Sequence, residues 1–213
     1  MVNNRHYIKI LVGLVLWVAF NLSAFGFSPF NNYPGINPKV LALGLKAYQY
    51  AASTGKVSKS ILVIVDYTIK SSKKRLWVLD LKHKKVLANF HVAHGKGSGS
   101  VLMATTFSNR PGSKASSLGT YVTGNDYIGG KGRSLRLYGL EKGINDAAFK
   151  RTIVLHPAWY VSKSFRDKQG YSGRSYGCFA VNPKVSNKLI NTIEDGSVLF
   201  AYAPQIENDP NLS

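Results

Sequence analysis

The feature that most constrains the fold is a succession of short runs of β-branched and aromatic residues, separated by turns rich in Lys, Ser and Gly. Such runs are typical of strands in a sheet. We expect strands at 61–67, 75–81, 86–93, 101–108, 119–124, 134–140, 151–156, 178–181 and 197–202. Helices are expected only at 37–54, where Asn37-Pro38 offers an N-cap and a first-turn proline, and from Pro183 to Gly196. This pattern indicates a mainly β fold, a β-sandwich or partly closed barrel with one or two peripheral helices.

The N-terminus has the layout of a secretory signal peptide over residues 1–26. Basic residues precede an apolar run at 10–20, and Ala24 and Gly26 stand at the −3 and −1 positions of a cut before Phe27. The apolar run is shorter than the about 20 residues that a membrane-spanning helix needs. We therefore expect an exported protein of the periplasm or cell envelope, with an uncleaved anchor or a buried helix as the alternatives.

The rest of the 213 residues fits one globular domain, because 45% hydrophobic and 18% charged residues are ordinary proportions. We expect a linker at 27–36, a helix at 37–54, the main domain at 55–206 and a tail at 207–213. No internal repeat or low-complexity segment interrupts this organisation, and we expect a monomer.

The chain is strongly basic, with 28 Lys and Arg against 10 Asp and Glu and a net charge of +18. Such a surplus favours a polyanionic partner. The basic residues are scattered without a nucleic-acid-binding motif, and export would separate the chain from nucleic acid, so we expect none as partner. Carboxylate-rich cell-wall peptides and an anionic envelope surface both remain possible.

Cys178 is the only cysteine, so no disulfide can form within the chain. A lone thiol in an oxidising compartment is better explained by chemistry than by packing, although a small buried hydrophobe is the alternative. A thiol nucleophile needs a base, and His156 precedes it in the same region. Gly173 and Gly177 permit a turn that points the amides of Gly177 and Cys178 into one pocket, as an oxyanion requires.

The pattern His156-x(18)-Ser175-x-Gly177-Cys178 resembles the signature of the L,D-transpeptidase catalytic domain, in particular its murein branch. The resemblance extends through 92–99, 117–156 and 177–183. It implies a peptidoglycan L,D-transpeptidase that forms an acyl-enzyme with a stem tetrapeptide, releases D-Ala and transfers the acyl group to an amine. The product would be a 3–3 cross-link or a protein attached to the wall.

The resemblance also implies roles for individual residues. Cys178 is the expected nucleophile, and His156 is the base that deprotonates it and then protonates the leaving amine. Gly177 is expected to line the site with its backbone. No carboxylate partner for His156 stands out in the sequence, so the group that orients it stays open.

Substrate contacts are expected from Ser175, Arg174, Tyr176 and His94. Ser175 belongs to the motif, and His94 begins a segment that matches the family. Arg174 is our addition from its position, because a guanidinium can hold a carboxylate in bidentate fashion. It would replace the polar group that many members carry where this chain has Ala180, and a solvated surface arginine is the alternative. His156 is followed by Pro157, where many members have glycine.

No metal or organic cofactor is expected. His91 and His94 lie three positions apart in an expected strand and would point to opposite faces. Two alternatives to the transpeptidase stay open. One is an L,D-carboxypeptidase with water as the acceptor, and the other is a non-catalytic basic envelope protein that binds anionic cell-wall polymer.

Overall fold

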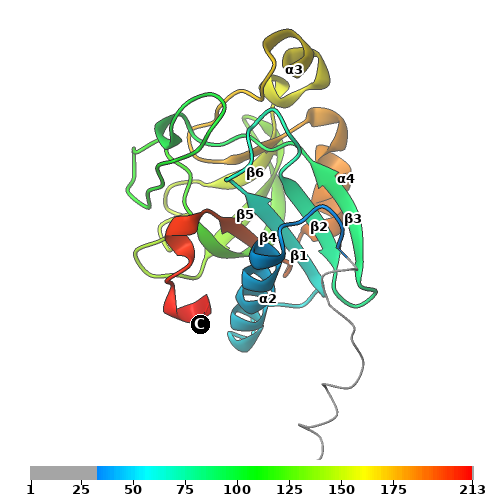
Figure 1. Cartoon of the computed structure of the whole chain (residues 1–213), viewed down its shortest axis with the longest axis vertical. Helices are drawn as coiled ribbons and strands as arrows, with labels where there is room; N and C mark the ends of the chain where they lie inside the picture. Colours follow the sequence, from blue (N-terminus) through cyan, green and yellow to red (C-terminus); the bar gives the residue numbers. More distant parts are fainter. Residues whose placement is uncertain (1–32, 213) are drawn as a thin grey trace, which may run out of the picture. The chain divides into compact units, whose positions relative to one another are not determined.

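The computed structural model describes residues 33–212, and its centre is one curled eight-stranded sheet (Figure 1). The strand order is β3-β2-β1-β8-β4-β5-β6-β7. The strands are β1 (Ile61–Asp66), β2 (Leu76–Asp80), β3 (Lys85–Phe90), β4 (Gly119–Gly129), β5 (Gly132–Gly139), β6 (Val154–Pro157), β7 (Phe179–Val181) and β8 (Val198–Tyr202). The pairs β1–β8 and β6–β7 are parallel, and the others are antiparallel. The mainly β fold is confirmed, and it is a partly closed barrel.

The segment that follows β3 joins the two edges of the sheet. Val92 forms a bridge with Val181 of β7, and the Ala93 amide donates to the Ala180 carbonyl at 2.9 Å. The chain of one edge strand thus continues alongside the strand at the other edge. This contact covers backbone groups of β7 that would otherwise be unpaired.

The strand expected at 101–108 is absent, and that prediction was wrong. This stretch is a loop whose only ladder contact is the bridge between Gly99 and Ala104. The Ser98 carbonyl accepts from the amides of both Thr105 and Thr106, at 2.7 and 3.1 Å. The segment therefore folds back on its own preceding turn, and its backbone groups are used before they can pair with a strand.

Three α-helices lie in the described part of the chain: α2 (Pro38–Ser53), α3 (Lys163–Gln169) and α4 (Pro183–Ile193). Asn37 and Asn182 cap α2 and α4 through side-chain oxygens, and each helix begins with proline. The sequence predicted two helices, which correspond to α2 and α4, and α3 was not expected. Near the C-terminus, where the sequence indicates a tail, Leu212 is 2% exposed and belongs to the core.

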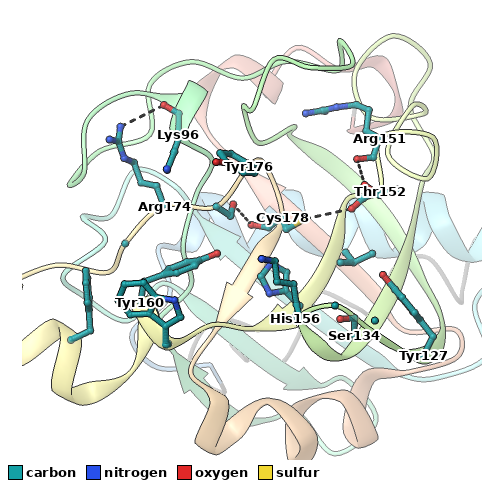
Figure 2. Close-up of a pocket in the computed structure, with 18 residues that line it drawn as sticks. Lys96, Tyr127, Ser134, Arg151, Thr152, His156, Tyr160, Arg174, Tyr176 and Cys178 are labelled. Carbon is teal, nitrogen blue, oxygen red and sulfur yellow. Dashed lines mark hydrogen bonds between the residues drawn. The ribbon is translucent and has the colours of Figure 1, made fainter.

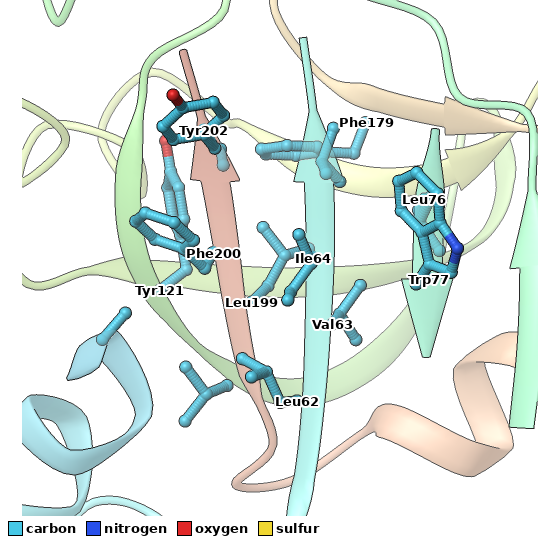
Figure 3. Packing of buried hydrophobic residues seen from close by; sticks show 14 of the residues in the cluster. Leu62, Val63, Ile64, Leu76, Trp77, Tyr121, Phe179, Leu199, Phe200 and Tyr202 are labelled. Carbon is cyan, nitrogen blue, oxygen red and sulfur yellow. The ribbon is translucent and has the colours of Figure 1, made fainter. Parts of the chain in front are cut away.

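The core lies on both faces of the central strands. Every residue of β8 is buried, as are Leu62–Val65 of β1, which explains their continuous apolar runs (Figure 3). One face packs against α2 at Gly44, where an added Cβ would come within 2.8 Å of Ile64 Cδ1. Glycine at this position lets the helix approach the sheet closely. No helix in residues 33–212 has the length and apolarity to cross a membrane, and the expected signal peptide lies outside these residues.

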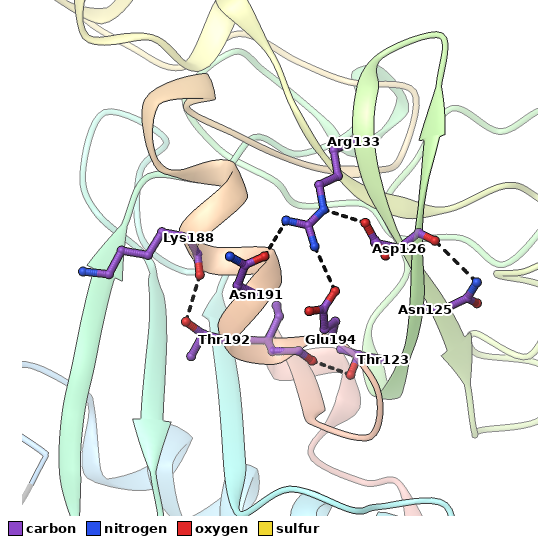
Figure 4. A network of polar contacts seen from close by, with 9 residues as sticks. Thr123, Asn125, Asp126, Arg133, Lys188, Asn191, Thr192 and Glu194 are labelled. Atoms are coloured by element: carbon purple, nitrogen blue, oxygen red, sulfur yellow. Dashed lines mark hydrogen bonds and ion pairs between the residues drawn. The ribbon is translucent and has the colours of Figure 1, made fainter.

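A polar network fixes the β4–β5 hairpin to α4 (Figure 4). Arg133 on β5 binds Asp126 on β4 at 2.5 Å, and it also binds Asn191 and, at 3.0 Å, Glu194. Each pair is partly solvated, so by itself it contributes little to stability. Together they hold the tip of the hairpin, which contributes to the cavity described below.

We expect the Phe200→Ala variant to lose about 3–5 kcal/mol of unfolding free energy, because Phe200 on β8 is fully buried. Urea denaturation measures this loss. The control is Ile128→Ala, whose side chain is 80% exposed and whose stability we expect to stay within about 0.5 kcal/mol of the parent. Equal stability of the two variants would contradict this description of the core.

Candidate active site

The parallel pairing of β6 with β7 brings His156 and Cys178 to one face of the sheet. The register sets Leu155 opposite Phe179 and His156 opposite Ala180. Because side chains alternate along strands, Leu155 and Phe179 enter the core, whereas His156 and Cys178 line a cavity of about 650 Å³. The two side chains lie diagonally across the strand pair at the centre of this lining (Figure 2).

The Cys178 thiol is held as the neutral form. Burial raises the pKa of the thiol above its usual range, although backbone N–H groups of Val154 and of Cys178 itself, and the charges of Arg151 and Lys131, oppose the rise. Its Sγ donates to the Thr152 carbonyl at 3.5 Å. At neutral pH the free protein therefore has less thiolate here than an exposed cysteine would have.

The His156 ring is also neutral, and its tautomer is fixed. Nδ1 lies 2.8 Å from the Pro157 carbonyl, which can only accept, so Nδ1 carries the proton and Nε2 has a free lone pair. Burial lowers the pKa of His156, and the Lys131 charge adds to this effect. The orienting group that the sequence left open is thus a backbone carbonyl. The arrangement provides a base at Nε2.

The turn before Cys178 is closed by Ser175. Its Oγ donates to the Cys178 carbonyl at 2.7 Å and accepts from the Gly177 amide at 3.1 Å. Gly177 has φ +119°, and an added Cβ would lie 2.7 Å from the Ala115 carbonyl oxygen, so only glycine fits. The expectation of a free Gly177 amide does not fit, because Ser175 already occupies it, and Gly177 is not among the residues that line the cavity.

The segment that begins at His94 fastens this turn from the other side. The Ser175 amide donates to the His94 carbonyl at 2.9 Å, and the Lys96 amide donates to the Ser175 carbonyl at 2.8 Å. Ser116 adds a contact from its Oγ to the Gly177 carbonyl. Cys178 therefore follows a turn that two distant loops hold in place.

His94 itself does not line the cavity, contrary to its expected place among the substrate contacts. Its ring is fully buried, with Nδ1 2.8 Å from the Arg75 guanidinium and Nε2 2.8 Å from the Ser100 carbonyl. Since Arg75 can only donate, Nε2 carries the proton. Burial and the Arg75 charge lower the pKa of His94 to about 4. The ring of His94 supports the loop at Ser100, and its carbonyl supports the turn before Cys178.

Arg174 and Tyr176 do line the cavity, as does Ser175 (Figure 2). Arg174 Nη1 donates to the Gly99 carbonyl at 2.7 Å, which steadies the guanidinium at the rim. Tyr176 is 63% exposed, and the ammonium groups of Lys96 and Lys114 lie 5.1 and 5.3 Å from its ring centroid.

Sequence reasoning missed several lining residues, and two of them, Lys131 and Thr152, act directly on Cys178. Lys131, at the tip of the β4–β5 hairpin, makes no hydrogen bond within the described residues, yet its charge acts on both Cys178 and His156. Thr152 has φ +53°, a strained conformation for a β-branched residue that aims its carbonyl at the sulfur. The flanking Gly129, Gly130 and Gly132 were the only sequence signal for Lys131.

The cavity is cationic. Lys96, Lys131, Arg151 and Arg174 belong to its lining, and among the described residues that form it there is no Asp or Glu. Arg151 is occupied by the Ser108 and Ala115 carbonyls, both at 2.6 Å. The other three leave positive charge facing the cavity, which attracts carboxylates. In residues 33–212 no group of three or more His, Cys, Asp or Glu side chains could hold a metal ion.

We expect His94→Leu to lower the unfolding free energy by about 1–3 kcal/mol, because it leaves a buried Arg75 donor without its acceptor. His94→Asn provides an oxygen near the position of Nδ1 and should lose less. Chemical denaturation measures both variants. Equal stability of His94→Leu and the parent would contradict the supporting role.

We expect the rate of Cys178 alkylation by iodoacetamide to rise about tenfold per pH unit from pH 6 to pH 9, since only the thiolate reacts and its pKa is raised. Mass spectrometry of the labelled protein measures the rate, and Cys178→Ala is the blank. A plateau below pH 7 would reveal a stable thiolate–imidazolium pair and would contradict the neutral pair.

Several solved L,D-transpeptidases resemble the chain in structure at low sequence identity. The enzyme from Mycobacterium smegmatis is 14% identical, with a TM-score of 0.41 over 68% of this chain and 59% of that one. The enzyme from Stackebrandtia nassauensis is 17% identical, with a TM-score of 0.39 over 76% and 66%. Residues 123–326 of the Xylanimonas cellulosilytica enzyme are 13% identical, with a TM-score of 0.37 over 78% and 94%. The chain thus spans about three fifths of the first of these proteins.

A search of curated protein sequences gave no match. A family model described as the L,D-transpeptidase catalytic domain matches residues 32–202, which are most of the chain. The chain therefore belongs to the L,D-transpeptidase catalytic domain family.

Proposed function

We propose that the protein is a peptidoglycan L,D-transpeptidase with Cys178 as nucleophile and His156 as base. The observation that carries this proposal is the β6–β7 register, which sets a thiol and a neutral imidazole on one wall of an open cationic cavity. Family membership supports the reaction class. The cationic lining supports a donor rich in carboxylates, as cell-wall stem peptides are.

In the first half-reaction His156 Nε2 takes the thiol proton as Sγ attacks the carbonyl of the diamino acid at stem position 3. A neutral pair suits this role, because the base is unprotonated until substrate arrives. The carbonyl oxygen becomes an oxyanion. The backbone amides of Cys178 and Val154 lie against the sulfur and are therefore placed to donate hydrogen bonds to this oxyanion. The imidazolium then protonates the leaving nitrogen, D-Ala departs, and a thioester remains.

In the second half-reaction an amine attacks the thioester and restores the thiol. His156 accepts the proton that the amine loses and returns it to sulfur. A stem-peptide amine gives a 3–3 cross-link, a protein amine gives wall attachment, and water gives a shortened stem, the carboxypeptidase outcome. Every outcome passes through the same acyl-enzyme.

Positive charge favours the thiolate that forms during attack. Lys131 and Arg151 stabilise negative charge at Cys178, whereas Lys131 disfavours charge on His156. The imidazolium is therefore short-lived and readily gives its proton to the leaving group. We further propose that the protein acts in the cell envelope, where its substrate is found.

We expect the purified protein to convert a disaccharide tetrapeptide to the species lacking D-Ala and to a cross-linked dimer. Mass spectrometry of the products measures both. Cys178→Ala should abolish both, and His156→Ala should slow acylation by about 10²–10⁴-fold through loss of the base. Unchanged turnover by Cys178→Ala would refute the proposal and favour the non-catalytic wall-binding alternative.

A further inference from the structure

The segment between the two catalytic strands forms an arm that joins the body of the protein at its base, where Val161 packs against Ala93 and Ala180. It contains a 3₁₀ turn, η4 (Trp159–Val161), and α3, which stands away from the sheet (Figure 1). No residue of α3 is buried. Tyr160 packs partly against this small cluster, but packing does not account for the exposed ring of Trp159 or for Phe165 on α3.

The arm presents an exposed but ordered indole. The side chain of Trp159 is 71% exposed. Its ring packs edge to face against the rings of Tyr160 and Phe165, with centroid distances of 5.8 and 5.4 Å. These contacts hold the ring in one orientation and leave much of it to solvent. An exposed tryptophan that neighbouring rings hold in place is typical of a binding surface.

The arm is fixed at both ends. The Ser162 hydroxyl caps α3 by accepting from the Phe165 amide, and Gly170 ends the helix in a left-handed conformation. Beyond it, the Ser172 hydroxyl donates to the Ser71 carbonyl at 3.0 Å, and the Gly173 amide donates to the Tyr160 carbonyl at 2.8 Å. The aromatic surface is thus formed before any ligand binds, which reduces the entropy lost on binding.

Trp159, Tyr160 and Phe165 line the same cavity as Cys178, and Figure 2 shows Tyr160 on the α3 side of the nucleophile. The cavity therefore has two kinds of lining: aromatic side chains on the arm, and cationic side chains at Lys96, Lys131 and Arg174. A ligand that matches both has an anionic chain joined to a ring with an apolar C–H face. A peptide attached to a pyranose has both properties.

We propose that these three aromatic residues form a subsite for a sugar ring of the glycan to which the stem peptide is attached. This inference rests on the proposed function. A lipid surface fits less well, because the rings line a concave cavity that also contains Lys96, Lys131 and Arg174, and α3 beside them carries the exposed ion pair of Lys163 and Asp167. A sugar, with a polar rim and apolar faces, suits an indole in such surroundings.

The test compares two acyl donors with the full-length protein and the Trp159→Ala variant. One donor is the disaccharide tetrapeptide, and the other is the same tetrapeptide without sugar. Loss of one stacked ring face, on the order of 60 Å² of apolar contact, corresponds to about a tenfold change in affinity. We expect KM for the disaccharide donor to rise about tenfold with kcat retained, whereas both constants for the sugar-free donor stay within about twofold.

The matched control is Phe149→Ala, because Phe149 is 57% exposed and does not line this cavity. It should leave both donors unaffected. An equal rise in KM for both donors would assign Trp159 to the peptide, and no rise for either would remove the subsite; each result overturns the inference. Weaker binding of Trp159→Ala to phosphatidylglycerol vesicles, with unchanged donor kinetics, would overturn it in favour of a lipid surface.

A binding measurement separates this inference from the proposed function. Titration with a peptide-free oligosaccharide of alternating N-acetylglucosamine and N-acetylmuramic acid, followed by isothermal titration calorimetry, requires no catalysis and does not use Trp159 as its reporter. Binding by the parent and by Cys178→Ala, with loss in Trp159→Ala, supports the subsite even if no donor is turned over. Absence of binding by the parent, together with no sugar dependence of KM, overturns it.

Discussion

The structure depends most on the hydrogen-bonded register between β6 and β7. Parallel pairing sets His156 opposite Ala180, and strand alternation then turns His156 and Cys178 to the cavity while Leu155 and Phe179 enter the core. A slip of one residue would reverse this assignment and send the imidazole into the interior. The same apolar residues that stabilise the barrel therefore hold the two reactive groups on one face.

The short strand β7 would be a weak support by itself, and loops that precede it in the chain reinforce it. The segment 92–96 pairs with β7 and with Ser175, so the edge that closes the barrel also holds the turn before Cys178. This segment is anchored in turn by the buried Arg75, whose guanidinium binds the carbonyls of Ile69 and Val92 and the ring of His94. The guanidinium is satisfied without a carboxylate contact, and burial lowers its pKa to about 10.

Burial and charge act in opposite directions on the thiol and in the same direction on the imidazole. Burial raises the pKa of Cys178 and lowers that of His156, and the neighbouring cations moderate the first effect but add to the second. The resting pair is neutral in an environment that favours negative charge. Such a site is suited to attack by a thiol that loses its proton only as the bond to substrate forms.

The order of apolar runs, the proline-initiated helices and the Ser-x-Gly-Cys motif were enough to predict a mainly β domain of this family, because strand periodicity and helix caps are local properties. The same reasoning predicted a strand at 101–108 that is a loop, because the backbone amides of this segment bind its own preceding turn. It also overlooked α3, because that helix has only seven residues and is defined by its caps at Ser162 and Gly170. It chose His94 as a lining residue and missed Lys131. Only the tertiary structure decided the places of these two residues. Burial of the His94 ring and exposure of the Lys131 ammonium to the cavity depend on contacts between segments far apart in the chain.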